Sequence, residues 1–298
     1  MPSETARGDG VGPILFPRRA VLRGGLGAAV AVATGPARAA DEVSIGVNPL
    51  FLDSDIQLLA SLRDYLAQRL GRPVQLVKRR TYQEITAMLL SGQLDAAWIC
   101  DCPYVQNQDR LSLLATPIFR GEPHYQTYVA VGPRAEANSF DDIGGTVHAF
   151  SDPDSTSGYL VTRYLLAVKR TTPAQFFRAS FFTYGHRNVV RAVASGLAES
   201  GSIDGYVYDV LAVREPGLVA PVRVVYKSEK LGFPPIVGLK SAGDQKLQQA
   251  IARAFLDMAA TPSGRQLLAT LNLDGFTASE PELYRGTLEK WLVVKAQS

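Results

Sequence analysis

The chain has 298 residues, 46% of them hydrophobic, with 31 Lys or Arg, 28 Asp or Glu and a formal net charge of +3 at pH 7. Residues 1–39 carry five of the basic and two of the acidic residues, so the other 259 residues hold 26 of each and are neutral. A neutral chain of this size can bury one large core or two modest ones. It lacks the basic surface of a nucleic-acid-binding protein, so we expect no nucleic-acid partner.

The N-terminus has the pattern of an export signal. Arg18 and Arg19 precede an apolar run at 24–35, and Ala37-Arg38-Ala39 has the small-x-small form of a cleavage site. An apolar run of about a dozen residues is too short to cross a bilayer. Paired arginines before a weakly apolar run indicate the twin-arginine route. We therefore expect residues 1–39 to be removed on export to the periplasm; the alternative is a cytosolic protein with an apolar arm.

After the leader, strand and helix patterns alternate along the chain. The expected strands are 43–47, 74–77, 95–99, 146–150, 181–184 and 205–208, and the expected helices are 56–70, 82–90, 158–168, 188–198, 244–260, 262–271 and 281–291. Such alternation predicts mainly parallel sheets covered by helices on both faces, an α/β fold. Two lobes joined by crossovers near Val131 and Tyr226 fit this layout, with 42–130 plus 228–298 in lobe 1 and 131–227 in lobe 2. A single large α/β domain fits the periodicity equally.

A run of hydroxyl side chains lies just before an expected helix. Ser155, Thr156 and Ser157 follow Asp152-Pro153-Asp154, and the helix begins near Gly158. The free amides and the dipole of a helix N-terminus favour an anion, and hydroxyls add hydrogen-bond donors without a formal charge. The segment is therefore a candidate oxyanion site. The alternative is an ordinary N-cap in a Ser/Thr-rich turn.

A second loop, at 184–188, also joins an expected strand to an expected helix. It contains His186, one of only three histidines in the chain. Ligands of open α/β sheets bind outside the carboxyl ends of the strands, where this loop would lie. A histidine there can donate to an oxyanion and titrates near neutral pH. The alternative is a purely structural histidine.

These segments, with several others in order, resemble the periplasmic phosphonate- and phosphite-binding components of ABC importers, which have the type 2 periplasmic-binding-protein fold. The matching segments are Arg80-Thr81-Tyr82, 94–98, 151–158, Gly185-His186, 193–196 with Ile203-Asp204, and 234–237. The resemblance implies two lobes with the ligand in the cleft between them. It also implies a monomer that delivers a small oxyanion to a membrane permease, without catalysis, cofactor or metal.

The resemblance also assigns roles to single residues. Ser155, Thr156, Ser157 and His186 would hold the anionic oxygens from one lobe. Tyr82 and Tyr125 would close over the ligand from the other lobe. Asp204, within the matching segments, is a further candidate ligand contact.

The sequence departs from the family at the acidic residues that hold the amine of aminoalkyl phosphonates. One such position falls at Val210-Leu211, near Asp209, and the other at Phe233-Pro234, so no carboxylate stands at either. The expected ligand is therefore a compact oxyanion such as phosphite, phosphate or a small phosphonate, and not a zwitterion.

The two cysteines, Cys100 and Cys102, follow the third expected strand and are compatible with a second function. Relatives in this broad family serve as periplasmic arsenite sensors that signal to a histidine kinase, and a soft thiolate suits a thiophilic ligand. Cys100 is therefore a candidate ligand contact. The alternatives are inert buried thiols or a strained local disulfide. An enzyme is not expected, because the sequence contains no Gly-x-Ser-x-Gly elbow and no recognisable nucleophile–base–acid set.

Overall fold

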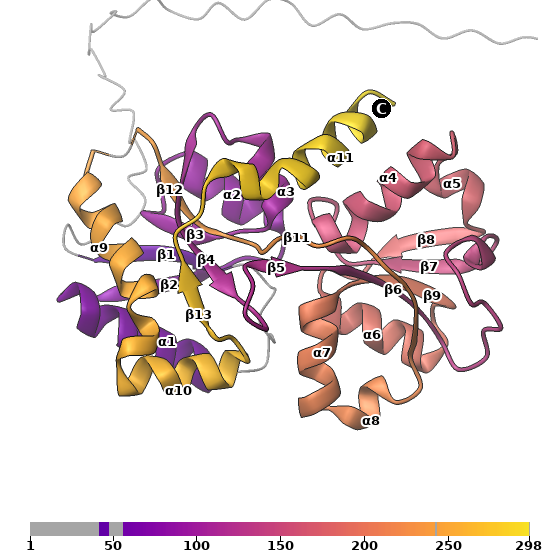
Figure 1. Ribbon diagram of the computed structural model, residues 1–298, viewed down its shortest axis with the longest axis horizontal. Coiled ribbons are helices and arrows are strands. Elements are labelled where there is room, and N and C mark those ends of the chain that lie inside the picture. The colour runs from indigo at the N-terminus through magenta and orange to yellow at the C-terminus, as the bar shows by residue number, and fades with distance from the viewer. Residues whose placement is uncertain (1–41, 48–55, 242, 298) are drawn as a thin grey trace, which may run out of the picture. The chain divides into compact units, whose positions relative to one another are not determined.

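The computed structural model describes residues 42–47, 56–241 and 243–297. The expected export signal, residues 1–39, lies outside this part of the chain. Two sheets dominate the described part (Figure 1). The first sheet has the order β13-β4-β12-β3-β1-β2. Its strands are β1 Val43–Val47, β2 Val74–Lys78, β3 Ala96–Trp98, β4 Leu111–Ile118, β12 Ile236–Leu239 and β13 Gly275–Thr277. We call this sheet and the helices packed on it the first lobe.

The second sheet has the order β10-β6-β9-β7-β8 and, with its own helices, forms the second lobe. Its strands are β6 Thr127–Val131, β7 Val147–Phe150, β8 Ala179–Phe182, β9 Ser200–Asp204 and β10 Arg223–Lys227. The helices of the first lobe are α1 Ile56–Leu70, α2 Tyr82–Leu90, α3 Asp101–Gln106, α9 Gln245–Leu256 and α10 Pro262–Leu271. Those of the second are α4 Val161–Val168, α5 Pro173–Phe176, α6 His186–Ser195, α7 Gly205–Arg214 and α8 Pro216–Val219. Short helical turns lie at Asp141–Ile143, Thr156–Leu160, Met258–Ala260 and Pro281–Tyr284.

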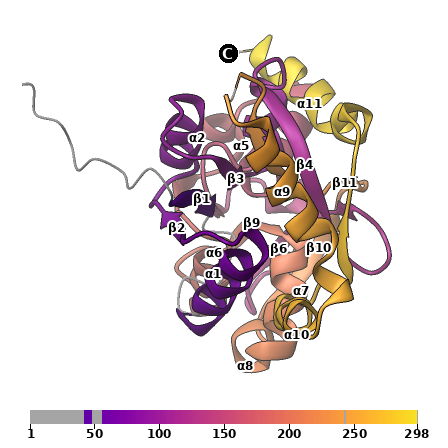
Figure 2. The ribbon, with the colours of Figure 1, turned by 90° about the vertical axis from the view of Figure 1, so that its left-hand side faces the viewer.

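The central strands of each sheet bury side chains on both faces, since alternate strand residues point to opposite sides. In β3, Ala96 and Trp98 join the apolar cluster that contains α1, whereas Ala97 joins the cluster that contains α2. Figure 2 shows α1 and α2 on opposite sides of β1 and β2. In β6, Ala130 and Val131 divide in the same way, Ala130 toward α6 and Val131 toward α4.

The sheets are mixed, which differs from the mainly parallel sheets expected. β12 lies antiparallel between β3 and β4, and β6 pairs antiparallel with β9 and β10. The α/β class itself is confirmed. The expected strand at 205–208 is wrong: β9 ends at Asp204 and α7 begins at Gly205. The Asp204 carboxylate accepts hydrogen bonds from the amides of Tyr206 and Val207 and so starts a helix there.

Two extended segments cross between the lobes side by side (Figure 1). The short strands β5 His124–Tyr125 and β11 Leu231–Gly232 pair antiparallel. The Thr127 amide donates to Ser228 Oγ at 2.9 Å, and the Ser228 amide donates to the Thr127 carbonyl at 2.9 Å. Because β6 pairs within the second sheet from Thr127 onward, we propose that the lobe boundaries, expected at 131 and 227, lie at these two paired segments.

The last helix, α11 Arg285–Lys295, contacts both lobes. It packs against α3 of the first lobe and against α4 and the turn at 156–160 of the second. Lys290 is buried, pairs with Glu229 and lies 4.8 Å from the ring centroid of Tyr164 in α4. Among the described residues, no helix has the length and hydropathy of a membrane span.

Candidate functional site

The hydroxyl-rich loop follows the carboxyl end of β7 and runs into a single π-helical turn at Thr156–Leu160. Ser155 caps this turn, since its Oγ accepts from the Gly158 amide at 3.0 Å. The capping role, one alternative from the sequence, therefore falls to Ser155. Ser157 is 1% exposed, and its Oγ has no hydrogen-bond partner among the described residues. A buried hydroxyl without a partner costs stability, which is typical of a group kept for a ligand.

His186 begins α6 and points its ring at this loop. Its Nδ1 accepts from the Asp204 amide at 3.0 Å, so the neutral ring carries its proton on Nε2. Nε2 lies 3.3 Å from Tyr82 Oη and 3.4 Å from Ser155 Oγ. Burial lowers the pKa of His186 to about 3, so the ring is neutral at physiological pH. His186 therefore supplies a fixed, uncharged N–H donor next to the hydroxyls.

The first lobe meets the loop through α2 and the segment before α3. Tyr82 is the first residue of α2, directly after a capping box formed by Thr81 and Glu84. The Tyr82 amide donates to Asp152 Oδ2 at 3.3 Å, which joins the lobes. Burial raises the pKa of the Tyr82 hydroxyl well above its usual range, so it stays protonated.

Cys100 hydrogen-bonds to the loop, whereas the described hydrogen bond of Cys102 lies within α3. The Thr156 amide donates to Cys100 Sγ at 3.4 Å, and the thiol lies 3.7 Å from Thr156 Oγ1. Cys102 Sγ accepts from Gln106 within α3 instead. Both cysteines are free, and burial raises both thiol pKa values well above their usual range.

Asp101 is a site residue that the sequence reasoning missed. It is fully buried, and its Oδ1 accepts from the Tyr125 hydroxyl at 2.8 Å, while its Oδ2 accepts from Thr287 Oγ1 of α11 at 2.7 Å. Burial raises the carboxyl pKa, and these hydrogen bonds oppose the shift. Thr287 is 186 residues away, so only the strand-to-helix position of Asp101 hinted at its place. Because the Tyr125 proton is already used, only the oxygen lone pairs of this hydroxyl are left for a further hydrogen bond.

All eight candidate residues are buried, and the structure brings them into one region between the lobes. Those from the first lobe and its crossover are Tyr82, Cys100 and Tyr125, and those from the second lobe are Ser155, Thr156, Ser157, His186 and Asp204. Within the described ranges, no group of three or more His, Cys, Asp or Glu side chains could hold a metal ion.

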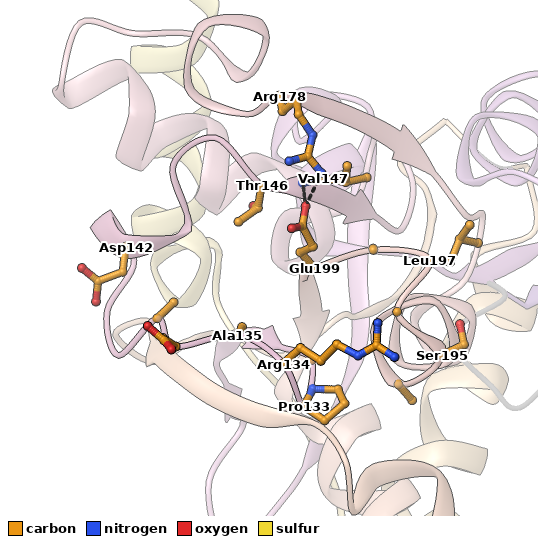
Figure 3. A pocket seen from close by; sticks show the side chains of 16 residues that line it. Pro133, Arg134, Ala135, Asp142, Thr146, Val147, Arg178, Ser195, Leu197 and Glu199 are labelled. Carbon is orange, nitrogen blue, oxygen red and sulfur yellow. Dashed lines mark hydrogen bonds and ion pairs between the residues drawn. The ribbon is translucent and has the colours of Figure 1, made fainter.

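A separate pocket of about 730 Å³ lies in the second lobe and contains none of these residues (Figure 3). Val147, the first residue of β7, and Glu199 line it, and Arg178 pairs with Glu199 at 2.6 Å. The pocket thus lies at the amino ends of β7 and β9. The hydroxyl loop follows the carboxyl end of β7, so the pocket and the candidate site are at opposite edges of the sheet.

Comparison with known proteins fits this arrangement. A family model described as "ABC transporter, phosphonate, periplasmic substrate-binding protein" matches residues 45–284. The chain belongs to this phosphonate-binding family. It is 24% identical over 221 residues to the phosphonates-binding periplasmic protein of Escherichia coli, covering 72% of this chain and 65% of that protein. It is 27% identical over 180 residues to the phosphate-import protein PhnD of Mycolicibacterium smegmatis, covering 56% of each. The aligned part thus spans less than two thirds of either relative.

Solved structures of the phosphonate-binding family have the same fold. A binding protein component of an ABC phosphonate transporter from Pseudomonas aeruginosa superposes with a TM-score of 0.79 at 19% identity, covering 86% of this chain and 87% of that one. PhnD1 from Prochlorococcus marinus, in complex with methylphosphonate, gives 0.78 at 16% identity, covering 86% and 98%. The expected two-lobed type 2 periplasmic-binding-protein fold is confirmed. Residue roles do not follow from these likenesses.

Proposed function

We propose that the protein is a periplasmic solute-binding protein that captures a small phosphorus oxyanion, such as phosphite, phosphate or a small phosphonate, for an ABC importer. One observation carries the proposal: His186 Nε2–H at the start of α6 and the partnerless Ser157 hydroxyl in the turn at Thr156–Leu160 are buried, uncharged donors on two neighbouring loops. Such donors bind an anion without a fixed counter-charge, which suits capture followed by release. The names of the Escherichia coli and Mycolicibacterium smegmatis relatives support this ligand class.

The remaining parts of the proposal concern partners and location. The protein would act as a monomer, deliver its ligand to a membrane permease and catalyse no reaction. It would reach the periplasm by the twin-arginine route indicated by Arg18 and Arg19. Family membership supports the permease and the periplasm, and the sequence of the leader supports the route.

Ser157→Ala tests the site with two readouts of opposite sign. Removing a buried hydroxyl that has no partner should leave the free energy of unfolding unchanged or higher. A hydrogen bond to a charged group is worth roughly 1.5–3 kcal/mol, so affinity for phosphite, phosphate and methylphosphonate should fall about tenfold or more. Isothermal titration and urea unfolding measure both. Ser195→Ala, at the far end of α6, is the control and should change neither. Unchanged affinity in Ser157→Ala would remove the loop from the ligand site.

The contact between Cys100 and Thr156 supports a second candidate, an arsenite-binding sensor protein that signals to a histidine kinase. Arsenite is neutral near pH 7, so sulfur would have to provide most of its attraction. Cys100→Ser should then abolish arsenite binding, while Cys102→Ser, outside the contact, should retain it. For a phosphorus oxyanion, Cys100→Ser should change affinity less than about threefold. The raised thiol pKa favours the oxyanion, because a protonated thiol is a weak ligand for a thiophile.

A further inference from the structure

The candidate site contains hydrogen-bond acceptors as well as donors. Asp204 is fully buried, and its Oδ1 is occupied by the amides of Tyr206 and Val207 at the start of α7. Its Oδ2 has no hydrogen-bond partner among the described residues. Burial raises the pKa of Asp204 to about 7, so above neutral pH Oδ2 is a buried carboxylate oxygen without a donor. Such an oxygen is costly, and a donor from a ligand would remove that cost.

Asp204 is part of the oxyanion site through its backbone. The Asp204 amide holds the ring of His186, whose Nε2 faces the hydroxyl loop. Burial raises the pKa of the Tyr82 and Tyr125 hydroxyls most, and the charge of Asp204 adds to the shift in both, so the carboxylate acts on these two side chains of the site. The other charged groups that act on it, Asp101 and Asp209, are both acidic. In the described part of the chain, no Lys or Arg side chain pairs with Asp204.

Tyr125 adds a second acceptor at the same place. Its hydroxyl proton is committed to Asp101 Oδ1 at 2.8 Å, which leaves the oxygen lone pairs. Asp101 cannot turn away, because Thr287 holds its other oxygen at 2.7 Å. A fully deprotonated oxyanion could accept from the Ser157 and His186 donors but would leave the Asp204 carboxylate without a donor. An oxyanion that keeps one proton offers an O–H group to that carboxylate.

We propose that Asp204 Oδ2 accepts a hydrogen bond from the ligand, so that the site selects tetrahedral oxyanions with one P–OH group and rejects anions of the same shape and charge that have none. This selection rule rests on the proposed function, since it concerns the same site. The selection rule assigns a hydrogen-bond acceptor to the site at Asp204. This position differs from the two at which the family's amine-binding acids would stand, Val210-Leu211 and Phe233-Pro234, where this sequence has no carboxylate.

Methylphosphonate and methanesulfonate form a matched pair of probes. The comparison is made just above pH 7, because burial raises the pKa of Asp204 to about 7 and the side chain is then mainly a carboxylate. Both probes are tetrahedral, and the singly charged phosphonate carries a hydroxyl that the sulfonate lacks. Because an unmet buried acceptor costs a factor of roughly ten to a hundred, the wild-type protein should bind methylphosphonate more tightly by about that factor. Asp204→Asn keeps the cap through Oδ1 and replaces Oδ2 by an N–H donor. It should weaken methylphosphonate, strengthen methanesulfonate and bring their ratio to about one or below.

Asp209→Asn is the matched control, because it removes a nearby negative charge from the same helix. Asp209 is paired with the exposed Arg120 at 2.7 Å, and the variant should leave the preference for methylphosphonate unchanged. Equal wild-type affinities for the two probes, or an unchanged ratio in Asp204→Asn, would overturn the selection rule and leave the proposed function standing. Failure of wild-type protein to bind phosphate, phosphite and methylphosphonate would overturn both. The wild-type comparison decides the rule even if Asp204→Asn does not fold.

Discussion

Gly158→Ala is the most demanding test of how the hydroxyl loop is packed. A Cβ added at Gly158 would lie 1.7 Å from Ser151 Oγ and 2.7 Å from Ser151 Cβ. Real Cβ contacts are essentially never shorter than 3.0 Å, so the loop has to move by more than 1 Å. Rotation of the Ser151 hydroxyl does not remove the 2.7 Å contact with Ser151 Cβ, which the backbone holds in place because the Ser151 amide donates to the Gly158 carbonyl at 3.2 Å.

The expected cost follows from this clash. Overpacking a well-filled interior costs typically 1–3 kcal/mol, and a contact this short belongs at the upper end, about 3 kcal/mol. For a chain of this size, that lowers Tm by about 6–12 °C. The same movement displaces the donors of the oxyanion site, so phosphite affinity should fall about tenfold or more. Scanning calorimetry and isothermal titration measure the two effects.

Two further variants separate the clash from a general effect of alanine. Gly217→Ala should be neutral or stabilising, because nothing lies within 4 Å of the added Cβ in α8. Adding Ser151→Gly to Gly158→Ala removes both short contacts and should recover most of the lost Tm. If Gly158→Ala keeps the wild-type Tm and affinity, or if Ser151→Gly does not rescue it, the packing described for this loop is wrong.

Two further buried polar groups, His148 and Asp101, contribute to stability. His148 lies between Ser200 and Ser202, and burial lowers its pKa from 6.5 to about 3, so its contribution to stability is present above pH 6.5 and is lost as the pH falls toward 3. In His148→Gln, the free energy of unfolding should therefore fall less steeply with decreasing pH below 6.5, and the slope should differ from that of the wild type by about 1.4 kcal/mol per pH unit. Urea unfolding at several pH values measures this, and equal pH slopes in the two proteins would contradict it. Thr287→Val leaves Asp101 Oδ2 without its donor and should lower the free energy of unfolding by about 1–3 kcal/mol in the same assay. Thr277→Val, at a half-buried threonine, is the control. Equal losses of unfolding free energy in the two variants would argue against a special role for the contact between Thr287 and Asp101.

Much of the fold could be predicted from local pattern. β1, α1, α2 and α10 lie where hydrophobic periodicity placed them, because each buries a regular apolar face. The segment at 205–208 misled, since its aromatic and β-branched side chains suit a strand. The segment forms a helix because the Asp204 side chain caps its first amides.

The rest depends on partners far apart in the chain. β12 is too short and too apolar to reveal that it lies antiparallel between β3 and β4. The candidate hydroxyls and His186 were found because they follow strands, which is a local signal. Asp101 was missed because its environment is made by Tyr125 and by Thr287 of α11, and no local pattern encodes that meeting.

The position of β12 in the first sheet determines the order in which the protein can assemble during synthesis. β4 ends at Ile118, and among the described strands its neighbours in the sheet are β12 and β13, which begin at Ile236 and Gly275. A growing chain therefore completes the continuous second sheet, residues 127–227, before the first sheet can close. Folding of that segment brings β5 and β11 together and shortens the loop that β12 must span. A substitution that slows the second lobe should therefore delay the first lobe as well, even where it touches no first-lobe residue.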